Sequence, residues 1–111
     1  MSRGGLIVYN WAAQNSDKVA CIYADAPVMD IKSWPMGKGA YAGSAEDVTR
    51  MLAAYGFKNE EQALRWKKNP LNHAAKIAQA DIPVLHVVGD ADDIVPVSEN
   101  TALFEAEMKR L

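Results

Sequence analysis

Two short apolar runs, separated by a long mixed segment, dominate the pattern of hydrophobic and polar positions along the chain. They cover residues 19–24 and 82–88 and contain β-branched residues, which is typical of buried strands. A stretch of apolar and small residues over 4–15 precedes the first run and predicts a helix. Near-continuous apolar strands linked by helices are typical of a parallel sheet covered on both faces, so the pattern predicts an α/β fold.

Residues that favour helix starts recur after the first predicted strand. Ser44, with Asp47 three residues later, resembles a capping pair and predicts a helix over 45–55. Similar signals predict further helices that begin at Asn59, at Pro70 and, after the second strand, at Ser98. The helices between the strands are more than a simple crossover requires. Residues from about 36 to 80 are therefore expected to form a helical cap inserted over a site.

Length and composition predict one globular domain that covers residues 1–111. Half of the residues are hydrophobic and 23% are charged, so the chain can bury a core and is not of the disordered class. A net charge of −2 with mixed signs gives no reason to expect nucleic acid or an anionic membrane as a partner. No apolar stretch approaches the ~20 residues of a membrane span. No signal peptide is visible, which makes the cytoplasm the default expectation.

The first residues contain a candidate nucleophile. Ser2 and Gly4 match the second half of the G-x-S-x-G pattern, in which a serine occupies a sharp turn between a strand and a helix. The leading glycine of this pattern, and the strand that carries the turn, would precede Met1. The sequence therefore predicts that the chain begins within a nucleophile elbow.

The segment 89–96 (GDADDIVP) contains a candidate acid. Its three carboxylates, Asp90, Asp92 and Asp93, directly follow the second predicted strand, where α/β sheets place their sites. Taken alone, these residues would be turn formers and acids that precede a helix. An aspartate held at this position can also orient a histidine and stabilise the imidazolium that forms during acyl transfer.

Taken together, these features resemble the α/β-hydrolase superfamily. The segment 82–96 is similar to the penultimate strand of that fold followed by its G-x-x-D-x-x-V-P turn, and residues 19–27 look like the strand after the elbow helix. The resemblance covers almost the whole chain, as the C-terminal portion of the fold from the elbow onward. It implies a partial α/β-hydrolase fold, with parallel strands, flanking helices and a helical cap-like insertion.

The resemblance also implies the roles of three residues. Ser2 would be the nucleophile, the backbone N–H of Arg3 would supply half of the oxyanion hole, and Asp92 would be the acid. The implied reaction is hydrolysis of a carboxylic ester or related acyl bond of a small molecule, through an acyl-enzyme and without a cofactor. The superfamily's histidine and second oxyanion donor lie in parts that this chain does not match, so the chain alone is expected to be inactive.

The two histidines of the chain are weak candidates for the missing base. His86 lies inside the second predicted strand and His73 in a predicted helix, and nothing in the spacing places either beside Ser2. Asp25, which follows the first strand, is an alternative acid. The histidines and aspartates show no metal-ligand spacing.

Two other functions remain open from the sequence. The chain could be a non-catalytic remnant or interaction module that pairs through exposed sheet edges, including self-association. If Met1 is removed, Ser2 could also be an N-terminal nucleophile whose own amine acts as base.

Overall fold

A computed structural model of the chain describes residues 2–89, 92 and 94–110. Within these residues, strands β1 (Ile22–Asp25) and β2 (Val84–Val87) form a two-stranded parallel sheet. Ile22 pairs with Val84 at one end, and Asp25 pairs with Val87 at the other. Both predicted strands are confirmed, although each is shorter than its apolar run and β1 starts at Ile22 rather than at residue 19.

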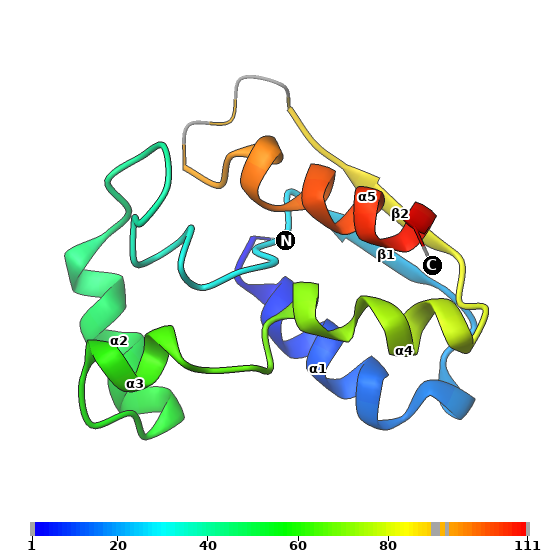
Figure 1. Ribbon diagram of the computed structural model, residues 1–111, viewed down its shortest axis with the longest axis horizontal. Helices are drawn as coiled ribbons and strands as arrows, with labels where there is room; N and C mark the ends of the chain where they lie inside the picture. The colour runs from blue at the N-terminus through cyan, green and yellow to red at the C-terminus, as the bar shows by residue number, and fades with distance from the viewer. Residues whose placement is uncertain (1, 90–91, 93, 111) are drawn as a thin grey trace.

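Three helices pack with this sheet around the main hydrophobic core (Figure 1). They are α1 (Gly4–Gln14), α4 (Ala74–Gln79) and α5 (Thr101–Arg110). Tyr9 of α1, Ile77 of α4 and Phe104 of α5 are almost completely buried and meet Ile22 of the sheet. Full burial of a large apolar side chain contributes about 1.5–3 kcal/mol, so this core accounts for much of the tertiary stability.

The opposite face of the sheet is exposed, which corrects the expectation of helices on both faces. Tyr23 of β1 and Leu85 of β2 are register partners with 63% and 59% of their surface exposed, and Val87 lies on the same face. Side chains alternate across a strand, so these residues face away from the helices that cover Ile22 and Ala24. Among the described residues, no element shields them from solvent.

A second, smaller core joins the start of α1 to α2 (Ala45–Tyr55) and α3 (Glu60–Leu64). The prediction for α2 is confirmed at both ends. Ser44 Oγ accepts a hydrogen bond from the backbone N–H of Asp47, and Gly56 ends the helix with a left-handed φ of 71°. A glycine adopts this backbone conformation without steric cost, which explains the stop. Asn59 caps α3 in the same way by accepting from Gln62 N.

Two predicted helix starts are displaced. Residues Pro70–His73 form a 3-10 turn and α4 follows at Ala74. Ser98 lies inside the 3-10 turn Val97–Glu99 rather than capping the last helix, and α5 begins at Thr101. Asn100, the residue before α5, is buried and its side chain bonds to Met29 N and Ser33 Oγ, which fixes the chain at the start of this last helix. The predicted end of this helix at Leu111 lies outside the described residues.

Two buried asparagines fix the segment that follows β1. Oδ1 of Asn100 accepts a hydrogen bond from the backbone N–H of Met29, and Oδ1 of Asn69 accepts one from Ile31, each over 2.8 Å. Asn100 Nδ2 also donates to Ser33 Oγ over 3.1 Å. Because buried backbone groups need partners, these bonds hold the segment against the start of α5 and the start of the 3-10 turn Pro70–His73.

Candidate functional site

Ser2 occupies a strained turn beside the carboxyl end of β1. Its φ is 46°, in the left-handed region that residues other than glycine rarely adopt. Its backbone N–H donates to the carbonyl of Asp25 over 3.0 Å, and its carbonyl accepts from Val28 over 2.9 Å. These two bonds stabilise a conformation that would otherwise cost about 1–3 kcal/mol.

Helix α1 starts immediately after Ser2, with Arg3 as its N-cap residue. The close approach between this helix and the segment after β1 falls at Gly5, because a Cβ added there would lie 2.8 Å from Cβ of Pro27. A Cβ on Gly4 would meet nothing within 4 Å. The close packing of α1 against the segment after β1 therefore depends on Gly5.

Asp92 is held in the turn after β2. Its Oδ1 atom accepts hydrogen bonds from the backbone N–H groups of Ile94 (3.0 Å) and Val95 (2.9 Å). These contacts give the carboxylate a defined orientation. The other two carboxylates of the sequence motif, Asp90 and Asp93, lie outside the described residues.

The fold brings Ser2 and Asp92 to the same end of the sheet, the one at which both parallel strands finish. The ends of β1 and β2 are adjacent, and Ala26 N donates to the carbonyl of Val87 over 2.8 Å. Ser2 bonds to the end of β1, and Asp92 follows β2. Val95 of the Asp92 turn also packs in the same core as Leu6 of α1. The alternative acid, Asp25, binds Ser2 through its backbone carbonyl.

Both histidines make hydrogen bonds elsewhere in the fold. Nε2 of His86 lies 2.6 Å from the Tyr9 hydroxyl and Nδ1 lies 3.1 Å from Thr101 Oγ1, while His73 Nε2 lies 2.9 Å from Asn10 Oδ1. Burial lowers the pKa of each imidazole below its usual value. Within the part of the chain that the structure describes, neither histidine is hydrogen-bonded to Ser2.

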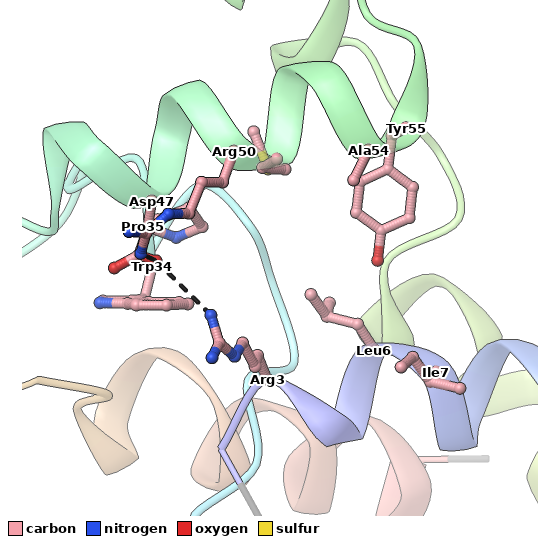
Figure 2. Close-up of a pocket in the computed structure, with 10 residues that line it drawn as sticks. Arg3, Leu6, Ile7, Trp34, Pro35, Asp47, Arg50, Ala54 and Tyr55 are labelled. Atoms are coloured by element: carbon pink, nitrogen blue, oxygen red, sulfur yellow. Dashed lines mark hydrogen bonds and ion pairs between the residues drawn. The ribbon is translucent and has the colours of Figure 1, made fainter.

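A pocket of about 210 Å³ lies between the start of α1 and helix α2 (Figure 2). Trp34 and Pro35 line it from the segment that follows β1. The sequence reasoning missed the contribution of α2, which lines the pocket with Asp47, Arg50, Met51, Ala54 and Tyr55. The available signal was their spacing of three and four residues, which puts them on one helix face.

The described residues hold neither a metal-ligand cluster nor a membrane-spanning helix. Residues 2–89, 92 and 94–110 contain no group of three or more His, Cys, Asp or Glu side chains placed to hold a metal ion. No helix among them is long and apolar enough to cross a membrane.

The parallel sheet and its helices are compatible with a partial α/β fold. Comparison with protein families defines the class as an α/β-hydrolase-type serine hydrolase. The model of the prolyl oligopeptidase family matches residues 1–110, and the chain belongs to that family. No curated protein and no solved structure gave a match. The superfamily expected from the sequence is supported, with a family name that indicates peptide rather than ester substrates.

Proposed function

We propose that Ser2 is the nucleophile and Asp92 the acid of a serine hydrolase that cleaves peptide, ester or related acyl bonds. The observation that carries this proposal is the left-handed backbone of Ser2, in the turn that precedes α1 and is hydrogen-bonded to the end of β1. Strain of this kind in a residue other than glycine is concentrated at functional sites. A nucleophile elbow uses such a turn to present the serine hydroxyl.

The proposed reaction follows from the groups around Ser2. Its Oγ attacks the acyl carbon, a histidine takes the proton, and the tetrahedral oxyanion accepts a hydrogen bond from the backbone N–H of Arg3. This N–H lies at the start of α1, where the helix dipole favours negative charge. Collapse of the intermediate expels the protonated leaving group, and water then hydrolyses the acyl-enzyme. Asp92 would orient the histidine through its carboxylate.

The base in this proposal comes from outside residues 1–111. His73 is hydrogen-bonded to Asn10, and His86 is hydrogen-bonded to Tyr9 and Thr101. Neither histidine is therefore placed to accept the proton of Ser2. We therefore expect the isolated chain to bind but not to turn over substrate.

Residues 36–80 are the proposed cap. Within this range, α2 and α3 lie away from the sheet in Figure 1, and α2 lines the pocket beside Arg3. Helix α4 lies in the same range but packs in the main core through Ala74 and Ile77. The part that acts as a cap is therefore expected to be α2 and α3, with the domain as a whole extending over 1–111.

The test is hydrolysis of chromogenic aminoacyl anilides and simple esters by the protein extended with the sequence that flanks these residues in its gene. Ser2→Ala and Asp92→Asn are each expected to lower kcat by at least about 10³-fold, because triad members act as a unit. Ser98→Ala, which removes a hydroxyl from the 3-10 turn, is the matched control. Retention of activity in Ser2→Ala would contradict the proposal.

One observation favours a second candidate, an interaction module that pairs through its sheet. Apolar side chains of α1 (Ile7, Trp11) and of the outer sheet face (Tyr23, Leu85) are exposed, and the surface beside β1 is lined by residues of both elements. An unpaired strand edge with apolar neighbours can add a further strand. This candidate predicts that Ser2→Ala has no effect on any activity, whereas changes at Tyr23 or Leu85 abolish association.

A further inference from the structure

The pocket between α1 and α2 has a charged end and an apolar end. Figure 2 shows the guanidinium of Arg3 pointing toward Asp47 near Arg50 and Trp34, while Leu6, Ile7, Ala54 and Tyr55 lie at the other end. The charged end is the one closer along the chain to Ser2. A ligand that fills this pocket would therefore meet charged groups at one end and apolar side chains at the other.

At the charged end of the pocket, Arg50 makes two ion pairs, whereas Arg3 makes one within the described residues. Asp47 Oδ1 is shared, at 3.5 Å from Arg3 Nη1 and 3.4 Å from Arg50 Nη1. Arg50 makes a second and shorter ion pair with Glu46, at 2.5 Å. Arg3 makes its one ion pair within the described residues through a single nitrogen, and 70% of its side chain is exposed.

This geometry leaves Arg3 able to bind a second carboxylate. A guanidinium carries several N–H donors in a planar fork, and a carboxylate can accept two of them side by side. Asp47 is held in place by the hydroxyl of Ser44, which donates to its Oδ2 over 2.8 Å. The helix side of the pocket is therefore pre-organised, and Arg3 can turn toward a ligand without loss of the α2 cap.

We infer that this pocket selects substrates in which a carboxylate lies close to the acyl group that is cleaved and an apolar side chain extends beyond it. The inference rests on the proposed function, because Ser2 directly precedes Arg3. A carboxylate on Arg3 would bring the acyl group toward Ser2, and the apolar group would be covered by Leu6 and Met51. Neutral substrates would lose the charged contact and bind less tightly.

The experiment uses the 111-residue chain and measures binding rather than turnover. The probes are N-acetyl-leucine and its amide, which differ in charge and little in size, titrated by calorimetry at low ionic strength. The carboxylate is expected to bind about threefold more tightly than the amide, since a solvent-exposed ion pair is lost in the amide. This difference is expected to shrink in 0.5 M NaCl because the site is solvent-exposed.

Three variants separate this inference from its alternatives. Arg3→Gln keeps the backbone N–H and is expected to abolish the preference for the carboxylate. Arg65→Gln removes an exposed arginine paired with Glu61 at 3.6 Å, away from the pocket, and is expected to keep the preference. Ala54→Trp fills the apolar end and is expected to weaken both probes alike. Far-UV circular dichroism checks that each variant folds.

Equal affinity of the two probes for the unaltered chain, or an unchanged preference in Arg3→Gln, would overturn the inference. The Ser2→Ala variant distinguishes a failure of this inference from a failure of the proposed function. If Ser2 is not a nucleophile, Ser2→Ala leaves activity of the extended protein unchanged while the carboxylate preference persists. If the pocket has no preference for a carboxylate, the probes bind equally while Ser2→Ala still abolishes activity.

Discussion

The hydroxyl oxygen of Tyr9 lies 2.6 Å from Nε2 of His86, and their rings meet edge to face at 5.9 Å between centroids. This contact joins α1 to β2 beneath Phe104, whose ring stacks on the imidazole. The Nδ1 atom of His86 is bonded to Thr101 at the start of α5. His86 is therefore a structural residue that ties two helices to the sheet, and its environment favours the neutral imidazole.

This environment predicts how stability depends on pH. Burial lowers the pKa of His86 below its usual value of 6.5, and burial also lowers that of His73. The unfolded chain therefore binds protons that the folded chain excludes as pH falls below about 6.5. We expect the free energy of unfolding, measured with urea, to be at its plateau above this pH and to decrease from pH 7 to pH 5.

Replacement of the titrating ring tests the origin of this slope. His86→Gln keeps a polar side chain but removes the titration, so the decrease between pH 7 and pH 5 is expected to become smaller, with the remainder due to His73. An unchanged slope in His86→Gln would show that His86 is not protonated differently in the two states.

The two glycines at the start of α1 are expected to respond differently to an added methyl group. Gly5→Ala would place a Cβ 2.8 Å from Pro27 Cβ and 3.1 Å from the Val28 carbonyl oxygen, which is expected to cost about 2 kcal/mol of stability. Gly4→Ala meets no atom within 4 Å and is expected to change stability by less than about 0.5 kcal/mol. Thermal unfolding followed by circular dichroism measures both. Similar losses in the two variants would mean that α1 does not approach the segment after β1 this closely.

The buried Asn100 predicts a large effect from a small substitution. Asn100→Ala removes the acceptor for Met29 N and the donor to Ser33 Oγ, leaving buried groups unpaired, at an expected cost of about 2 kcal/mol. Asn15→Ala removes an exposed bond to the Trp11 carbonyl and serves as control, with an expected loss below about 0.5 kcal/mol. Equal losses in urea unfolding would rule out a special role for Asn100.

The exposed face of the sheet predicts self-association of the chain. Tyr23 and Leu85 are neighbours on this face, and contiguous exposed apolar residues of this kind favour contact with another protein surface. We expect Tyr23→Lys combined with Leu85→Lys to shift sedimentation toward the monomer. Tyr41→Lys, which changes an exposed tyrosine of a loop, is expected to leave the distribution unchanged. A monomeric unaltered chain at high concentration would exclude this role.

Several features of the site could be predicted from local patterns in the sequence. The Ser44–Asp47 pair and Gly56 define α2, because a cap or a left-handed glycine acts within a few residues of its own position. The turn after β2 could be located for the same reason, since Asp92 bonds to the backbone of Ile94 and Val95. The prediction that the last helix begins at Ser98 was wrong. A serine favours a helix start through local contacts, but here Ser98 lies in the 3-10 turn Val97–Glu99 and α5 begins at Thr101.

The sequence by itself indicated the order of the main helices and strands, the resemblance to the α/β-hydrolase superfamily and the candidate residues Ser2, Arg3 and Asp92. Only the tertiary structure decided which residues meet across the chain, such as Asn100 with Met29, or Arg3 with Asp47. Hydrophobic periodicity and capping record forces between near neighbours in sequence. Contacts between distant segments depend on how those segments pack, so a buried asparagine and an exposed face of apolar strands could be identified only in the folded chain.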